Sequence, residues 1–351
     1  MERVEVVVVG GGQSGQAAAR ALRARGLAPV VLEASDRPAG SWPHYYDGLT
    51  LFSPARYSAP AELPFDGDPD RYPGRDEVVA HLLRGAELLD APLRLRTRVR
   101  EIRPRSDGFE VTTADGERWA ARAVVTASGS FGNPHRPALP GPGPFTGTLL
   151  HAAEYREPTP FAGRRVVVLG LGNSAVQIAA ELAGVARVTL AGRGRIRWTP
   201  QRPLGRDLHH WLGVTGLDTA PVGPLLRTPP RQPVIDDGRY RAALRAGGVR
   251  TRPVFTAVEG NRVTWPDGVV EEVDTVLLAT GYRPDLGYLA PLGVLDRRGV
   301  PRHRGGLSTV RPGLAHLGLE WQRSLASNTL RGVGRDARHV ARALERFLRR
   351  G

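Results

Sequence analysis

The segment VVVVGGGQSG, from Val6 to Gly15, places a run of four valines directly before a glycine-rich turn. The segment VVVLGLGNSA, from Val166 to Ala175, has the same order of residue types. An unbroken run of branched apolar residues is typical of a strand buried in a parallel sheet. Glycines at G-x-G spacing between a strand and a helix let a pyrophosphate approach the backbone. The two segments therefore predict two dinucleotide-binding units.

The elements that follow the two turns also share one order. Each turn leads into an alanine-rich helix, a short strand, antiparallel strands with tight turns, and a last buried strand. The elements expected are a helix ending near Gly26 and strands over 29–32 and 123–127 in the first unit, and a helix over 175–182 and strands over 187–190 and 275–279 in the second. We therefore expect an α/β fold of two Rossmann-like dinucleotide-binding domains, three-layered and with β-meander crossover strands.

The first turn has the features of a site for FAD. Gly10, Gly12 and Gly15 stand at G-x-G-x-x-G spacing. The helix N-terminus behind them offers free N–H groups to a pyrophosphate. Glu33 ends the second strand, where an acidic side chain accepts hydrogen bonds from the hydroxyls of an adenosine ribose. An acidic group at this place favours FAD or NAD over a nucleotide with a 2′-phosphate.

The second turn departs from the first in a way that favours NADPH. Gly170 and Gly172 match the pattern, and Ala175 replaces the third glycine, which the pattern permits. Arg193 stands where the first unit has Glu33, and a guanidinium can bind a 2′-phosphate through two hydrogen bonds. A solvated arginine is the alternative interpretation in so arginine-rich a chain. We expect residues 1–160 and 276–351 to form a discontinuous FAD-binding domain, with an NADP-binding domain, 161–275, inserted in it.

The composition excludes several kinds of chemistry. The 351 residues include no cysteine and no lysine, so disulfides, thiolate metal sites and lysine Schiff bases cannot form. His209 and His210 are adjacent and would point apart, so no metal site is expected. The net charge of +14 comes from dispersed arginines without a nucleic-acid-binding motif, so no nucleic-acid partner is expected. The absence of a membrane-spanning run and of a secretory signal predicts a cytoplasmic protein with no membrane partner.

With these two turns, the chain resembles the flavin-containing monooxygenase family over nearly its whole length. The segment FTGTLLHAAEY, over 145–155, carries that family's F-x-G-x-x-x-H-x-x-x-[Y/F] fingerprint. The segments GSW at 40–42 and ATGYRPD at 279–285 match further motifs, on the flavin side and at the return between the domains. The fingerprint residues are Phe145, Gly147, His151 and Tyr155.

The turns and the resemblance together assign the expected binding residues. Those for FAD are Gly10, Gly12, Gln13, Ser14, Gly15, Glu33, Ala34, Gly40, Ser41, Trp42, Val99, Ser128 and Gly129. Those for NADP are Gly170, Gly172, Asn173, Ser174, Ala175, Arg193, Thr280 and Gly281. No catalytic side chain is identified. We expect His151 to link the two domains through hydrogen bonds, with acid–base catalysis as the alternative role.

The resemblance also implies a reaction. NADPH would reduce FAD, O₂ would add to the reduced flavin, and the resulting flavin hydroperoxide would oxygenate a soft nucleophile such as an amine or a sulfide. The expected partners are therefore O₂ and a small-molecule substrate. Two alternatives stay open: an NADPH dehydrogenase that passes electrons to an acceptor other than oxygen, and a nucleotide-sensing regulatory flavoprotein.

Some positions differ from those of known relatives. An arginine follows Tyr155 where Baeyer–Villiger members carry Trp-Pro or Trp-Asp, which argues against conversion of ketones to esters. Pro54 stands where several amine- and sulfide-oxidising members place an asparagine beside the flavin. Residues 196–218, called the insertion below, could cover the cleft. Its Trp198 and Trp211 would either line a substrate path or pack internally.

Overall fold

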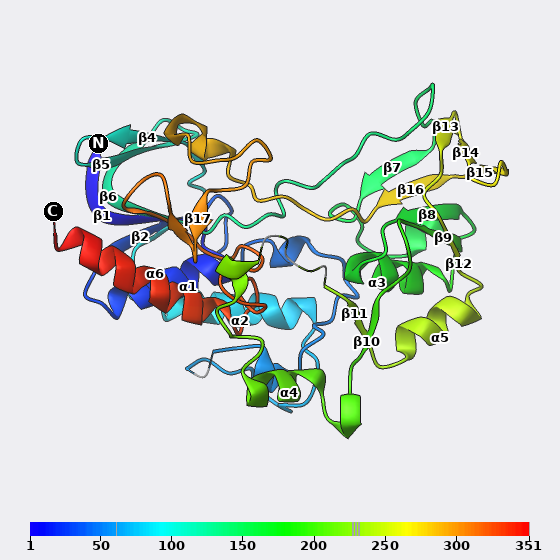
Figure 1. The fold of residues 1–351 in the computed structure, drawn as a ribbon, viewed down its shortest axis with the longest axis horizontal. Coiled ribbons are helices and arrows are strands. Elements are labelled where there is room, and N and C mark those ends of the chain that lie inside the picture. The colour runs from blue at the N-terminus through cyan, green and yellow to red at the C-terminus, as the bar shows by residue number, and fades with distance from the viewer. Residues whose placement is uncertain (61, 227, 229, 231, 351) are drawn as a thin grey trace.

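The structure is a computed structural model that describes residues 1–60, 62–226, 228, 230 and 232–350. Two sheets with parallel cores lie at opposite ends of the molecule, each built on one of the valine runs (Figure 1). The strands of the first sheet are β1 (Glu2–Val9), β2 (Pro29–Leu32), β3 (Leu93–Arg94), β4 (Val99–Arg105), β5 (Gly108–Thr113), β6 (Arg118–Thr126), β17 (His303–Arg304), β18 (Leu307–Ser308) and β19 (Leu314–His316). Their order is β17-β18-β19-β6-β1-β2-β3, and β4 and β5 join the sheet through β6.

The second sheet has five strands, all parallel, in the order β12-β9-β8-β16-β7. They are β7 (Thr148–His151), β8 (Arg165–Leu169), β9 (Arg187–Ala191), β12 (Arg250–Arg252) and β16 (Thr275–Leu278). Two small sheets accompany it: parallel β10 (Trp198–Pro200) and β11 (Val234–Asp236), and antiparallel β13 (Ala257–Glu259), β14 (Arg262–Thr264) and β15 (Val270–Glu272). The α-helices are α1 (Gln13–Arg23), α2 (Arg75–Glu87), α3 (Asn173–Leu182), α4 (Leu208–Thr215), α5 (Arg239–Ala246) and α6 (Val333–Leu348).

The two sheets repeat one topology. Strands β3-β2-β1-β6 of the first sheet correspond in order to β12-β9-β8-β16 of the second. In both, the chain returns to the central strand's other side through an antiparallel meander, β4–β5–β6 or β13–β14–β15. The fifth parallel strand, β19 or β7, comes from a segment outside each repeat. The predicted α/β fold of two Rossmann-like units is thus confirmed.

Both faces of the first sheet are covered, which explains why its central strand is apolar throughout. Val6 and Val8 pack against α1 and α6, which lie side by side on one face (Figure 1). Val7 and Val9 pack on the opposite face against the β4–β5 meander. All four valines are nearly or fully buried. In the second unit α3 and α5 cover one face and the β13–β15 sheet covers the other.

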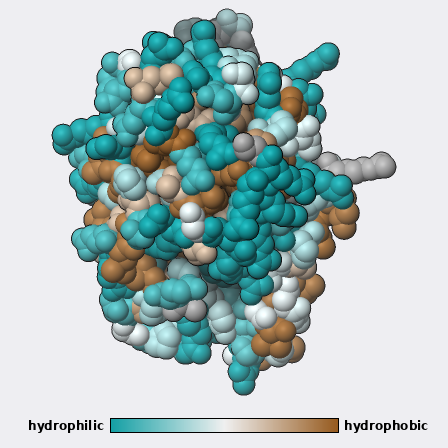
Figure 2. Space-filling view, turned by 90° about the vertical axis from the view of Figure 1, so that its left-hand side faces the viewer, coloured by the Kyte–Doolittle hydropathy of each residue, from teal (hydrophilic) through white to brown (hydrophobic). Residues whose placement is uncertain are grey.

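The face of the molecule seen in Figure 2 is mainly hydrophilic, with hydrophobic residues in scattered groups. This distribution is usual for a globular protein, whose polar surface never covers it completely. None of the described helices combines the length and the apolar character that crossing a bilayer requires.

Helix α2 begins after Gly74, whose N–H donates a hydrogen bond to the Glu77 side chain at 2.9 Å. One detail differs from the sequence-based expectations. The expected domain boundaries would split the second sheet, because β7 and most of β16 lie on the FAD side of them. By sheet membership the second unit runs from about 148 to 278.

The glycine turn before α1 yields a prediction about stability. A Cβ atom at Gly15 would overlap the carbonyl oxygen of Gly10, which is backbone and cannot rotate away. We expect Gly15→Ala to lower the free energy of unfolding by about 3 kcal/mol, as overpacking of a rigid site does. Gly184→Ala is the control, because a Cβ there meets no atom within 4 Å, and it should change stability by less than about 0.5 kcal/mol. Equal denaturant midpoints for the two variants would contradict the packing argument.

Candidate functional site

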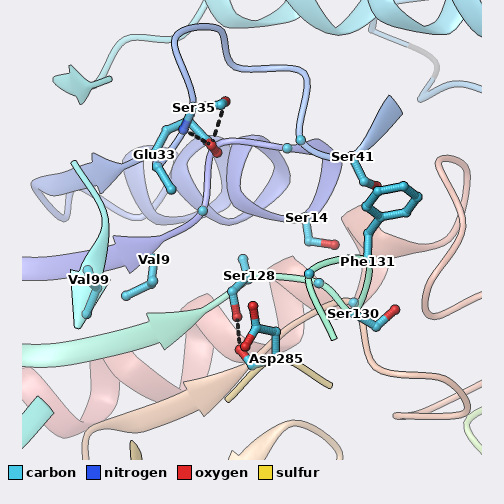
Figure 3. Close-up of a pocket in the computed structure, with 18 of the residues that line it drawn as sticks. Val9, Ser14, Glu33, Ser35, Ser41, Val99, Ser128, Ser130, Phe131 and Asp285 are labelled. Atoms are coloured by element: carbon cyan, nitrogen blue, oxygen red, sulfur yellow. Dashed lines mark hydrogen bonds between the residues drawn. The ribbon is translucent and has the colours of Figure 1, made fainter. Parts of the chain in front are cut away.

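A cavity of about 520 Å³ opens at the carboxyl ends of β1, β2 and β6 (Figure 3). In a parallel sheet this edge is where ligands bind. Twelve of the thirteen residues expected to bind FAD line it: Gly10, Gly12, Gln13, Ser14, Glu33, Ala34, Gly40, Ser41, Trp42, Val99, Ser128 and Gly129. Gly15 does not line the cavity, because it lies in the contact between α1 and the turn.

The backbone forms the wall of the cavity where the first turn approaches other segments. Gly10 has a φ of +104°, and a Cβ on it would lie 2.6 Å from the Ala127 carbonyl oxygen. A Cβ on Gly12 would lie 3.1 Å from the Cα of Gly40, so these two glycines let two backbones touch. The first turn of α1 contains no acidic residue, which keeps its free N–H groups available to an anion.

Glu33 marks one end of the cavity. It is only 6% exposed, and its Oε2 accepts a hydrogen bond from the Gly11 N–H at 2.5 Å. Its Oε1 accepts bonds from the Ser35 N–H at 2.8 Å and the Ser35 hydroxyl at 2.7 Å (Figure 3). These bonds hold the carboxylate in one orientation at the end of β2. Val99 and Thr97 line the same region.

Aromatic residues gather at the other end. Trp42, Tyr45 and Phe131 line the cavity, and the Tyr45 and Phe131 rings meet edge to face at 4.9 Å. Phe131 also stacks at 5.3 Å on Tyr282, which belongs to the segment returning from the second unit. The Tyr282 ring in turn contacts His151 edge to face at 5.1 Å. The aromatic cluster therefore joins the cavity to the region between the two units.

Several lining residues were not among the sequence-based predictions. Phe131 lies two residues after the predicted Ser128-Gly129 pair, and Asp285 lies in the ATGYRPD motif, so local signals for them existed. The Ser128 hydroxyl donates a hydrogen bond to the Asp285 carbonyl oxygen at 2.8 Å (Figure 3). Asn328 had no local signal, because it reaches the cavity from the far end of the chain.

The fingerprint histidine is engaged by backbone on both ring nitrogens. His151 is fully buried, and its Nδ1 accepts a hydrogen bond from the Ala153 N–H at 3.1 Å. Its hydrogen therefore resides on Nε2, which donates to the Gly281 carbonyl oxygen at 3.2 Å. Burial lowers the pKa of His151, which keeps it neutral. This geometry fits a linking role and leaves no free nitrogen for proton transfer to a substrate.

The other fingerprint residues lie in packing positions. The Tyr155 hydroxyl donates to Glu181 of α3 at 2.9 Å, and burial raises the pKa of the tyrosine. Phe145 packs at the edge of the β13–β15 core. A Cβ on Gly147 would lie 2.7 Å from the backbone carbonyl oxygen of Asp274, so that position must stay without a side chain.

The second glycine turn joins β8 to α3 as predicted from the sequence. Gly170 has a φ of +147° and approaches the Ala279 backbone, and Gly172 caps α3, whose first turn contains no acidic residue. Ala175 is fully buried, while Gly172 and Arg193 are exposed. The turn lies against the end of β9, because Leu171 contacts Gly192. Arg193 thus stands beside the turn, with no ion pair to any described residue.

Three of the four remaining residues predicted for NADP already have protein partners. The Thr280 hydroxyl donates to the His135 carbonyl oxygen, and the Gly281 carbonyl accepts from His151. The Asn173 side chain donates to the Pro233 carbonyl oxygen at 3.3 Å. Ser174 is half-buried at the start of α3. The backbone of the turn and Arg193 are therefore the groups most available to a dinucleotide.

The insertion crosses from the second unit to the first. Asp207 caps α4 and accepts hydrogen bonds from Tyr72 at 2.6 Å, from Gln201 at 2.7 Å, and from both the N–H and Nδ1 of His209 at 2.8 Å. Burial acts to raise the pKa of Asp207, but these bonds outweigh it and hold the pKa at about 2. His209 is nearly buried and stacks on Phe52 at 5.9 Å. These hydrogen bonds and this ring contact fix the insertion to segment 50–72.

The end of the insertion is attached to the C-terminal segment. Asp218 forms an ion pair with Arg331 at 2.9 Å, with both side chains largely buried. The Asp218 carbonyl oxygen also accepts a hydrogen bond from the Ala326 N–H at 2.9 Å. Trp198 packs under Arg241, and Trp211 donates to the Pro203 carbonyl oxygen, so neither lines the cavity. The packing interpretation of these tryptophans fits better than a substrate path.

Comparisons with known proteins agree with this geometry. Residues 7–208 match the family described as pyridine nucleotide-disulphide oxidoreductase. The chain is 33% identical to indole-3-pyruvate monooxygenase YUCCA1 of Oryza sativa subsp. japonica, covering 93% of this chain and 90% of that protein. It is 29% identical to an uncharacterized CzcO-like oxidoreductase of Geobacillus kaustophilus, covering 96% and 97%. The solved flavin-containing monooxygenase from Stenotrophomonas maltophilia matches with a TM-score of 0.87 and 32% identity, covering 99% of each chain.

The bonds to Asp207 predict how the insertion is held. Asp207→Ala would leave the donors of Tyr72, Gln201 and His209 without their acceptor. We expect a loss of about 2–3 kcal/mol in the free energy of unfolding and faster cleavage within the insertion by limited proteolysis. Asp90→Ala removes only an exposed partner of Arg23 and should leave both measurements unchanged. An Asp207→Ala protein as resistant to protease as the wild type would show that the insertion is held by other contacts.

Proposed function

Because this chain belongs to the pyridine nucleotide-disulphide oxidoreductase family and to the flavin-containing monooxygenases, we propose that it is an NADPH-dependent flavoprotein monooxygenase. FAD would occupy the cavity on the first sheet, and NADPH the open face at the second glycine turn. The substrate would be a small molecule with a soft nucleophilic atom, such as an amine nitrogen or a sulfide sulfur. The observation that carries the proposal is the cavity itself, which gathers residues from seven other segments around one glycine turn.

The residues present fit FAD. Gly10 and Gly12 carry no side chain that could cover the N-terminus of α1, which can therefore meet a pyrophosphate. The Glu33 carboxylate, held by Gly11 and Ser35, is placed to accept hydrogen bonds from ribose hydroxyls. When bound, FAD would accept a hydride from NADPH and, once reduced, activate O₂. The aromatic cluster around Phe131 would exclude water from that end of the cavity.

The family name includes disulfide reduction, but this chain has no cysteine. It therefore cannot pass electrons through a protein dithiol, the usual relay for such a reaction. The electrons of NADPH must leave through the bound flavin to O₂ or to another small acceptor. This constraint supports the monooxygenase interpretation over a thiol-based reductase.

The test follows the fate of the electrons and of oxygen in the purified full-length chain. With a panel of amines and sulfides and ¹⁸O₂, we expect one NADPH oxidised, one labelled oxygen atom in the product and one in water for each turnover. Faster NADPH oxidation with a quinone and no label in product would favour the dehydrogenase alternative. Binding of both cofactors with negligible turnover on every acceptor would favour a regulatory role. Either result would overturn the proposal.

The NADPH preference is predicted to depend on Arg193. A charge-assisted bond to the 2′-phosphate contributes about 1.5–3 kcal/mol, so Arg193→Ala should raise the Kd for NADPH about ten- to a hundredfold. The Kd for NADH should not change, because that cofactor lacks the phosphate. Arg262→Ala is the control for loss of a positive charge, because Arg262 is an exposed residue of β14. An unchanged ratio of the two affinities in Arg193→Ala would remove Arg193 from the site.

A further inference from the structure

Asn328 lines the cavity and carries a buried polar atom that the protein itself does not satisfy. It lies in the loop between β19 and α6 and lines the cavity. Its Oδ1 atom is buried and has no hydrogen-bond partner among the described residues. A buried acceptor without a partner is destabilising, so such an atom in a binding cavity indicates a donor on the ligand.

The loop around Asn328 holds the residue in one place. Its carbonyl oxygen accepts a hydrogen bond from the Gln13 side chain at 2.8 Å, and Gln13 accepts one from the Trp42 indole at 3.0 Å. The Ser327 hydroxyl accepts bonds from the Arg323 and Ser324 N–H groups at 3.0 and 2.9 Å. The unpaired Oδ1 atom is therefore carried by a loop whose backbone is hydrogen-bonded to Gln13, the first residue of α1.

The position of Asn328 along the cavity identifies the part of the ligand that it meets. Glu33 and Val99 define the end expected to hold the adenosine (Figure 3). The Asn328 carbonyl oxygen accepts a hydrogen bond from Gln13, and Gln13 accepts one from the Trp42 indole. Asn328 therefore lies in the part of the cavity near Trp42. With adenosine at one end and pyrophosphate at the α1 N-terminus, the ring system of FAD must lie at the Trp42 end.

We propose that Asn328 binds the pyrimidine edge of the flavin ring, an inference that rests on the proposed FAD site. That edge presents one N–H, at N3, between two carbonyl oxygens, and N3–H is the donor that the oxidised ring offers. A carboxamide carries an acceptor and donors side by side, which complements this edge. The Asn328 Oδ1 accepts from N3–H, and its Nδ2 donates to a neighbouring carbonyl oxygen. In this way a residue from the C-terminal segment orients the ring.

The test compares FAD with 3-methyl-FAD, in which a methyl group replaces the N3 hydrogen, each bound to the full-length chain. We expect the wild type to bind FAD about tenfold more tightly, which is the effect of one hydrogen bond. Asn328→Ala should bind FAD about tenfold more weakly than the wild type does and should no longer distinguish the two flavins. Asn328→Asp keeps an acceptor and should retain the preference. Its negative charge should also lower the midpoint potential of the bound flavin.

Two controls separate recognition of the ring from damage to the loop. Thr329→Ala removes the hydroxyl that donates to the Ala326 carbonyl oxygen but keeps the carboxamide, so its preference for FAD should persist. Asn261→Ala, at an exposed turn of the second unit, should match the wild type. An Asn328→Ala protein with the wild-type preference would overturn the inference while leaving the FAD site intact. A wild-type chain that binds neither flavin would overturn both the cofactor assignment and this inference.

Discussion

The contact between the Gly10 carbonyl and Gly15 is the constraint on which the arrangement of the first unit depends. Because residue 15 has no side chain, α1 can begin directly against the turn that ends β1. The helix N-terminus is then directed at the cavity, where its unpaired N–H groups can meet an anion. The same turn brings Gly12 against Gly40, which makes the GSW segment a wall of the same cavity. A bulkier turn would separate the elements that together form the site.

Buried polar contacts link the two units and the connections between them. His151 at the end of β7 bonds to the Gly281 carbonyl oxygen, so the outgoing and returning connections are linked at one point. The insertion reaches back to the first unit through Asp207 and Asp218. In each case the buried polar group has its partner, which is the condition for such contacts to stabilise one arrangement. The distance between the two glycine turns is thereby set.

The side chains of this protein include few groups that could react directly with a substrate. The chain has no cysteine or lysine, and its fingerprint histidine is neutral and occupied by backbone. In the proposed FAD site the side chains would supply orientation and exclusion of water: Glu33 at one end of the cavity, and Phe131, Tyr45 and Trp42 at the other. Such a division is consistent with an oxidoreductase in which a reactive flavin must be placed against a nicotinamide and a small substrate.

The repeated strand, glycine turn and helix were readable from the sequence, because each depends on residues close to one another in the chain. A strand whose two faces are both covered requires an unbroken apolar run, which Val6–Val9 supply. The turn requires glycine at position 10. These residues, and Glu33 at the end of the next strand, can therefore be identified from the local sequence. Which sheet each strand joins could not be predicted in this way. Strands β7 and β19 complete the two sheets from outside the repeats, so sheet membership does not follow the expected domain boundaries.

The contact of Asn328 with Gln13, the bond from Tyr72 to Asp207 and the Phe131–Tyr282 stack were likewise decided only by the tertiary structure. Each joins residues that are more than about 100 positions apart in the chain. No local pattern specifies a contact between side chains that meet only after both sheets have formed, because such contacts depend on how whole elements pack.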